Sequence, residues 1–204
     1  MSSLSDEVRV MLQPEGTYRQ LTHKLDWTKG GHREFRYLVR RPLFAALMLG
    51  AFVSITASGR LNALLVFDGL LFWSFVPLLQ ALTMMCLVLL FARPTLPKVR
   101  VVDLFFMGHG PWYLWLLMIS GTCLLMPTKQ IFMWPVTSGW ILPLSLLMVW
   151  MWSNFTTLGF LKGALHLSIG RAVSMLLAYN LCFWGVIVFY LFAIETLQLH
   201  RLRF

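Results

Sequence analysis

The sequence predicts an all-α protein, a polytopic transmembrane helical bundle of five spans with a cytoplasmic N-terminus and a non-cytoplasmic C-terminus. Residues 70–91 contain no ionisable side chain, and at about 1.5 Å per helical residue they can cross a hydrocarbon core of about 30 Å. The chain is 58% hydrophobic and 12% charged, whereas soluble domains are about 25% charged. The apolar runs between the cations place the spans at about residues 42–58, 63–91, 112–126, 138–160 and 169–196.

The first 41 residues are expected to form a basic cytoplasmic or interfacial segment before the five-helix domain of residues 42–204. This segment holds eight of the 17 Lys and Arg residues. It lacks the apolar core of a cleavable signal, so we expect the first span to start membrane insertion. Residues 14–21 predict a short interfacial helix with Tyr18, Leu21 and Leu25 turned to lipid. A solvated tail is the alternative.

The first two spans have recognisable starts. We expect the first helix to begin at Pro42, because the missing N–H of proline costs nothing in a first turn. Arg40 and Arg41 can extend this short span, since their aliphatic stems reach along lipid while their charges stay in the interface. Asn62 is expected to cap the second helix, and Pro77 is expected to kink it.

Prolines and charges predict the segments that connect the remaining spans. Two prolines and three cations should keep residues 93–103 out of the membrane. Residues 103–111 are apolar but broken by glycine and proline, which predicts an interfacial segment with Phe105 and Phe106 at the membrane surface. Pro143 is expected to kink the fourth span.

The orientation follows from the distribution of positive charge. With five crossings, 13 of the 17 Lys and Arg residues fall on the side of the N-terminus. Short loops rich in Lys and Arg stay in the cytoplasm, which places the N-terminus there. The formal net charge of +9 is explained by this topology, so we expect no nucleic-acid partner.

No pattern in the sequence indicates an enzyme. The three cysteines lie far apart in apolar runs, which predicts small buried apolar residues and neither a disulfide nor a metal cluster. The histidines have no metal-binding spacing, and neither a nucleophilic serine turn nor a phosphate-binding glycine loop occurs. We therefore expect no catalytic residue, no metal and no cofactor.

Two acids could enter the membrane, and such acids are candidate functional residues. Asp68 and Glu195 map to the same, non-cytoplasmic end of their helices. Glu195 lies near a helix C-terminus, which repels an anion, so it should pair with a cation such as Arg60. A path for protons or cations is the alternative.

A group of cations and histidines is expected to share the cytoplasmic interface. Such a group can bind a phosphate-bearing lipid headgroup, and a plain belt of interfacial charges is the alternative. The possible headgroup contacts are Arg93, Arg100, His109, Lys162, His166 and Arg171.

The five-span layout and three local stretches, residues 14–21, 108–114 and 158–172, carry a resemblance to a known family. They resemble the Yip family, the small Rab-interacting membrane proteins of the secretory pathway and their bacterial relatives. The resemblance implies a non-enzymatic membrane protein without catalytic residues. It also implies a bacterial inner membrane, or an endomembrane if the source is eukaryotic.

Two functions are therefore expected from the sequence. The first is an integral membrane scaffold or accessory subunit that organises a membrane or a larger complex, with membrane lipids and other integral membrane proteins as partners. The alternative is a small transporter or lipid-handling protein with a cavity between spans two, four and five, where prolines interrupt helices.

Overall fold

The computed structural model describes residues 4–24, 33–92, 96–126 and 137–201. Within these ranges the chain forms helices and no strand, which confirms the all-α prediction. The helices are α1 (Leu4–Leu12), α2 (Pro14–Lys24), α3 (Arg33–Ser58), α4 (Ala63–Trp73), α5 (Phe75–Phe91), α6 (Lys98–Met107), α7 (Gly110–Leu125), the π-helical turn η1 (Thr137–Ile141), α9 (Leu142–Gly163) and α10 (Ile169–Arg201).

Four helical segments among the described residues are long and apolar enough to cross a membrane. They are Arg40–Ser58, Ala63–Phe91, Gly139–Gly163 and Ile169–Ala193. The shorter α7 is apolar as well. This content defines a multi-pass α-helical membrane protein.

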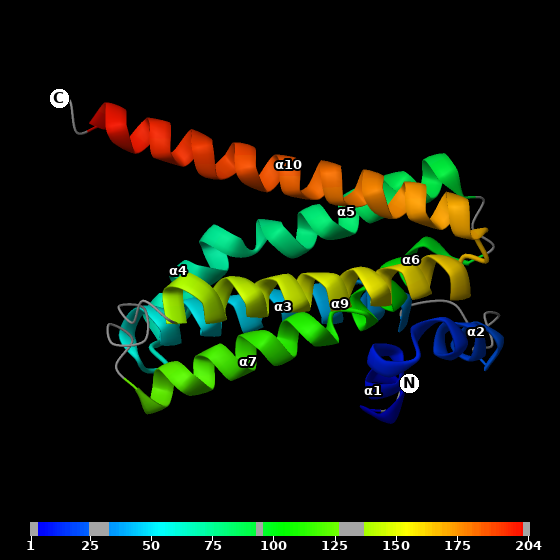
Figure 1. Cartoon of the computed structure of the whole chain (residues 1–204), viewed down its shortest axis with the longest axis horizontal. Coiled ribbons are helices and arrows are strands. Elements are labelled where there is room, and N and C mark those ends of the chain that lie inside the picture. Colours follow the sequence, from blue (N-terminus) through cyan, green and yellow to red (C-terminus); the bar gives the residue numbers. More distant parts are fainter. Residues whose placement is uncertain (1–3, 25–32, 93–95, 127–136, 202–204) are drawn as a thin grey trace.

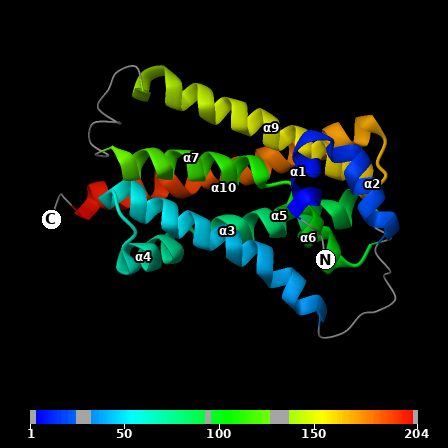
Figure 2. The ribbon, with the colours of Figure 1, turned by 90° about the horizontal axis from the view of Figure 1, so that it is seen from below.

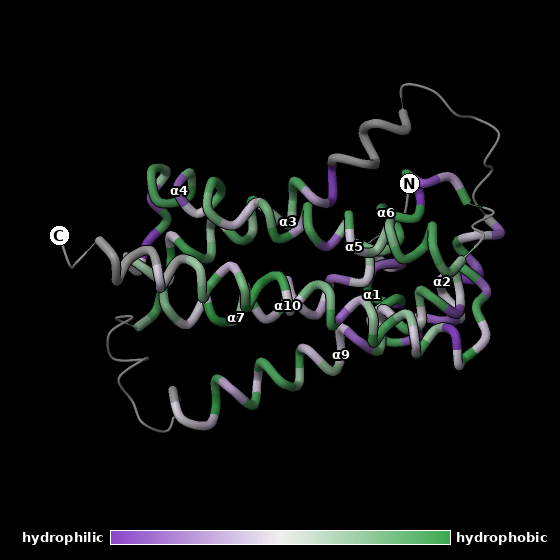
Figure 3. The backbone as a smooth tube through the Cα atoms, turned by 90° about the horizontal axis from the view of Figure 1, so that it is seen from above, coloured by the Kyte–Doolittle hydropathy of each residue, from purple (hydrophilic) through white to green (hydrophobic). Residues whose placement is uncertain are grey.

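The long helices lie in two layers along the long axis of the molecule (Figures 1 and 2). One layer contains α3, α7 and α9, and the other contains α5 and α10. Helices α1, α2 and α6 gather at one end, and the chain termini lie at opposite ends. Hydrophilic residues concentrate at the end that holds α1 and α2 (Figure 3).

The observed helix ends agree with several predicted span ends and differ at others. The C-terminal ends of α3 and α5 and the N-terminal ends of α4 and α10 lie at the predicted residues. Helix α7 begins two residues before its predicted start, at Gly110. Helix α9 continues past Phe160 to Gly163, and α10 continues to Arg201. Pro42 lies inside α3 instead of starting it, because a helix can pass a proline at the cost of one hydrogen bond.

The predicted proline kink is confirmed at one position and wrong at the other. The second span is interrupted at Ser74, between α4 and α5, because the ring of Pro77 clashes with the carbonyl of Trp73 four residues earlier. Pro143 instead lies in the first turn of α9, directly after η1. No break follows Pro143 within α9, which continues without interruption to Gly163.

Helices α3 and α4 pack so closely that their backbones touch. A Cβ atom added to Gly50 would lie 2.7 Å from the carbonyl oxygen of Val66, and one added to Gly69 would lie 3.0 Å from the Cα of Gly50. The Ser54 hydroxyl accepts the Asn62 N–H at 2.8 Å, and the Asn62 side chain accepts the N–H of the second residue of α4. The predicted Asn62 cap is confirmed.

The aromatic pair in α6 contradicts its predicted place at the membrane surface. Phe105 and Phe106 are both almost fully buried in the protein core, because α6 packs against α3, α5 and α9. The predicted burial of the cysteines is correct for Cys123 and wrong for Cys86 and Cys182, which are exposed on the bundle surface. Lipid tails are about as apolar as a protein core, and a free cysteine behaves as a small hydrophobe, so it can face either one.

Candidate functional site

The predicted headgroup residues do not form one pocket in the described part of the chain. Lys162 donates to the Glu15 carboxylate at 2.6 Å, which lowers the pKa of that carboxyl. His166 and Arg171 are exposed beside the turn between α9 and α10. His109 is buried, with 6% of its surface exposed.

The other predicted positions are only partly described. Arg93 lies outside the described residues, and so does the side chain of Glu195. Arg60 is exposed in the turn between α3 and α4, and Asp68 is partly exposed on α4. The proposed pair of Glu195 with Arg60 therefore stays a prediction.

A cavity of about 440 Å³ lies between the two helical layers. Residues of α3, α4, α5, α7, α9 and α10 line it, and most of its wall is apolar. This wall includes parts of spans two, four and five. The sequence predicted a cavity between these spans under the alternative function, a small transporter or lipid-handling protein. The aromatic members of the wall are Phe52, Trp73, Trp112, Tyr113, Trp115, Trp150, Tyr179, Phe183 and Trp184.

A chain of amide hydrogen bonds forms one polar part of this wall. The Asn180 side chain of α10 donates to Asn154 Oδ1 of α9 at 2.7 Å and accepts the indole N–H of Trp150 at 3.2 Å. The Asn154 amide itself donates to the Trp150 carbonyl at 2.8 Å. Polar residues at this depth of a span are expensive and are candidate functional groups. The cavity therefore combines a mostly apolar wall with a few hydrogen-bonding side chains, which include Gln80 and Ser153 besides the asparagine pair.

His109, between α6 and α7, also lines this cavity. Its Nδ1 lies 3.3 Å from the Phe105 carbonyl oxygen, and its ring stacks on Phe106 at a centroid distance of 4.7 Å. Burial lowers the pKa of His109 to about 4, because a charged imidazolium loses its hydration there. The residue is therefore neutral at physiological pH and contributes no cation to a headgroup site.

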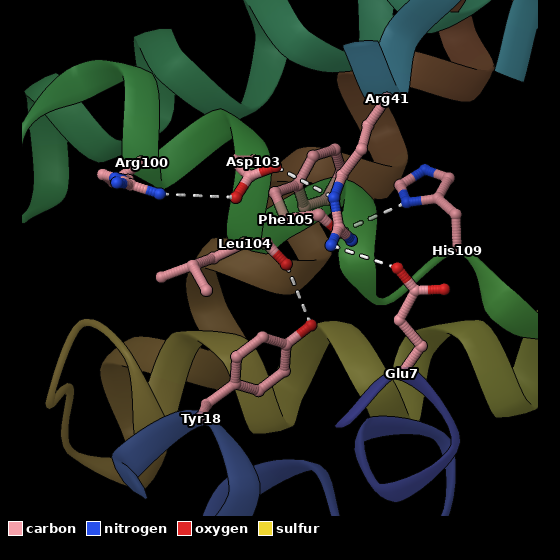
Figure 4. A network of polar contacts seen from close by, with 8 residues as sticks. All are labelled: Glu7, Tyr18, Arg41, Arg100, Asp103, Leu104, Phe105 and His109. Atoms are coloured by element: carbon pink, nitrogen blue, oxygen red, sulfur yellow. Dashed lines mark hydrogen bonds and ion pairs between the residues drawn. The ribbon is translucent and has the colours of Figure 1, made fainter. Parts of the chain in front are cut away.

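The N-terminal helices belong to the folded bundle. Tyr18 of α2 is fully buried, and its hydroxyl donates to the Leu104 carbonyl at 3.0 Å (Figure 4). Its ring meets that of Phe160 in α9, edge to face, at 5.6 Å. Leu21 is buried as well, whereas Leu25 lies outside the described residues. The sequence predicted that Tyr18 and Leu21 face lipid, or alternatively that they belong to a solvated tail. Both predictions are wrong, because these side chains are buried in the protein.

Helix α2 reaches these contacts because α9 presents two glycines to it. A Cβ atom on Gly163 would lie 2.5 Å from the Glu15 carbonyl oxygen, and one on Gly159 would collide with the ring of Pro14. Glycines four residues apart lie on one helix face and let another helix approach closely. The two glycines, four residues apart, can be seen in the sequence. The sequence does not indicate which helix packs against them.

Arg41 joins three helices through its guanidinium group (Figure 4). It lies 2.9 Å from the Asp103 carboxylate of α6 and 3.2 Å from the Glu7 carboxylate of α1. The Arg41 and Asp103 side chains are only 16% and 14% exposed. Burial raises the pKa of Asp103, while Arg41 and then Arg100 oppose that shift. The predicted snorkelling of Arg41 into the interface is wrong, because two carboxylates hold it inside the protein.

The fold and the cavity define an α-helical multi-pass membrane protein with a mostly apolar cavity between its two helical layers. Comparisons with known protein families, with curated proteins and with solved structures find no match.

Proposed function

We propose that this protein is a lipid-handling membrane protein that binds an apolar molecule with one hydrogen-bonding group between its two helical layers. The observation that supports the proposal is the cavity of about 440 Å³ with its amide pair, Asn154 and Asn180. Ligand sites of about 300–1,000 Å³ are mostly apolar with a few placed polar groups. An acyl chain or other lipid tail fits the aromatic wall, and an ester or hydroxyl group fits the amides.

The membrane topology is part of the proposal: five spans, with the N-terminus in the cytoplasm. Its support is the position of the termini at opposite ends of the bundle (Figure 1) and the positive charge on the side of the N-terminus. Helix α7, with 16 residues, is about 24 Å long. A local thinning of the bilayer accommodates a helix of that length.

Protease cleavage tests the topology. Sites are placed before residue 1 and after residue 204 of the full chain in sealed vesicles of known orientation. We expect protease added on the non-cytoplasmic side to cut only the C-terminal site. Cleavage of both sites from one side would show an even number of crossings and would remove α7 as a span.

A cavity-filling substitution tests the binding function. Val76 of α5 lines the cavity, and the larger side chain in Val76→Trp would narrow it. Val186→Trp is the matched control, because Val186 is exposed on α10 and lies outside the cavity wall. We expect the lipid bound per protein after mild detergent extraction, measured by mass spectrometry, to fall severalfold in Val76→Trp only. Equal retention in both variants would contradict the proposal.

A Yip-like scaffold or accessory subunit is the second candidate, and the shape of α10 favours it. This helix buries one narrow stripe of side chains against the bundle and exposes apolar residues around the rest of its surface. Such a face can pack against a partner span. The buried stripe consists of Ala172, Met175, Tyr179, Phe183 and Ile187.

The sample extracted in mild detergent separates the two functions, because a stoichiometric partner protein without retained lipid supports the scaffold.

A further inference from the structure

A second cavity, of about 830 Å³, lies at the end of the bundle that holds the N-terminal helices. Residues of α1, α2, α3, α6 and α7 line it. It is separate from the cavity of the proposed function, although Tyr113 lies in the walls of both. We call it the N-terminal groove.

One part of the N-terminal groove is charged, with equal numbers of positive and negative side chains. Arg41 occupies its centre and holds two of the carboxylates, and Arg100 lies 4.0 Å from one of them. Arg40 is exposed beside them, at the first residue of the candidate span in α3. The formal charge of the lining is therefore zero. The charged members are Asp6, Glu7, Arg40, Arg41, Arg100 and Asp103.

The other part of the N-terminal groove is apolar and runs along the two helices toward the membrane interior. Within two turns after the two arginines, α3 contributes Leu43, Phe44 and Leu47 to the groove, and α7 contributes Leu114 and Leu117. All five are exposed. From position 40 to position 47 a helix rises about 10 Å. The groove thus changes from charged to apolar over the distance between a phospholipid headgroup and its acyl chains.

Tyr113 lies in the wall of the groove. Its ring meets that of Phe44, edge to face, at 5.3 Å. Its hydroxyl oxygen is buried without a hydrogen-bond partner among the described residues. A buried hydroxyl without a partner costs stability. The Tyr113 ring therefore contributes an aromatic wall to the groove, beside Phe44.

We propose that the N-terminal groove binds a zwitterionic glycerophospholipid with an ammonium headgroup, of the phosphatidylethanolamine class. Its phosphate contacts Arg40 and Arg100, its ammonium group contacts Asp6 and Glu7, and an acyl chain follows the apolar residues of α3 and α7. The balanced lining favours a zwitterion, because an anionic headgroup would need a net positive site. This inference does not depend on the proposed function of the first cavity.

Lipid binding to purified, delipidated full-length protein tests the proposal. Phosphatidylethanolamine and phosphatidylglycerol with identical acyl chains are added in detergent, and bound lipid is counted by native mass spectrometry. The measurement is made in the wild type and in Val76→Trp, so that occupancy of the first cavity is separated from that of the groove. We expect a preference for phosphatidylethanolamine in both proteins.

Two pairs of matched variants locate the site. Arg40→Gln removes a headgroup contact, and Arg60→Gln is its control, because Arg60 is exposed in the turn between α3 and α4. Leu117→Trp obstructs the acyl path, and Leu124→Trp is its control, since these residues of α7 are 55% and 53% exposed and only Leu117 lines the groove.

Arg40→Gln is expected to weaken phosphatidylethanolamine binding about fivefold, the effect of one interfacial charge. Leu117→Trp should weaken it as well, and both controls should bind as the wild type does. A preference for phosphatidylglycerol would overturn the zwitterionic assignment. Equal binding by all four variants would overturn the site, and competition by glycerophosphoethanolamine alone would overturn the role of the acyl chain.

Discussion

Gly163→Leu is expected to release the N-terminal helices α1 and α2 from the bundle. Even a single Cβ atom at this position would lie 2.5 Å from the Glu15 carbonyl oxygen and 2.9 Å from Tyr18 Cβ. The first neighbour is backbone, so α2 must move as a whole. That movement separates the Tyr18 hydroxyl from the Leu104 carbonyl and exposes a side chain that is fully buried.

The cost of this release is about 3 kcal/mol, from the lost apolar burial of one aromatic side chain and one hydrogen bond. Hydrogen exchange of residues 4–24 measures it, and the protection of α2 is expected to fall about 100-fold. Gly121→Leu is the control on α7, because a Cβ atom there meets nothing within 4 Å. Unchanged protection of α2 in Gly163→Leu would show that α9 does not hold the N-terminal helices.

Arg41→Met is expected to lower the free energy of unfolding by about 2 kcal/mol at neutral pH. Removal of one partner leaves the Asp103 carboxylate, 14% exposed, without its nearest cation. Breaking a fully buried pair costs about 3–5 kcal/mol, and the remaining exposure and Arg100 reduce that figure here. Denaturation of the purified protein in mild detergent, followed at several pH values, measures the loss.

The sign of the pH dependence follows from Asp103. Burial already raises its pKa in the folded protein, and loss of Arg41 raises that pKa further. The folded variant then binds a proton more readily than the unfolded chain does, so its deficit should shrink as the pH falls toward 4. The double variant Arg41→Met with Asp103→Leu should recover most of the stability, because no buried charge is left alone. A deficit that is equal at every pH would contradict the role of Asp103.

Local sequence was sufficient to predict several parts of the fold. Asn62 caps α4 because its side chain accepts an N–H two residues later, and such a contact needs no other part of the chain. The break before Pro77 has the same local character, since the proline ring acts on the carbonyl four residues earlier. The second span was likewise readable as an apolar run from 63 to 91.

The candidate sites were less predictable because their members come from distant segments. Asn154 and Asn180 meet across α9 and α10, and nothing near either residue indicates the other. His109 was expected among interfacial cations, yet α6 and α7 enclose it beside Phe105 and Phe106. A histidine or an aromatic residue at a helix end has the same local pattern whether lipid or protein covers it.

The amino-acid sequence by itself determined that this chain is helical and enters a membrane, because apolar length and charge spacing act on each segment separately. Tertiary structure alone decided that Tyr18 is buried, that Arg41 bridges Glu7 and Asp103, and that a cavity opens between the layers. The physical reason is that close packing and charge pairing depend on distances between segments. Gly163 shows this most directly, since its lack of a side chain matters only where α2 crosses it.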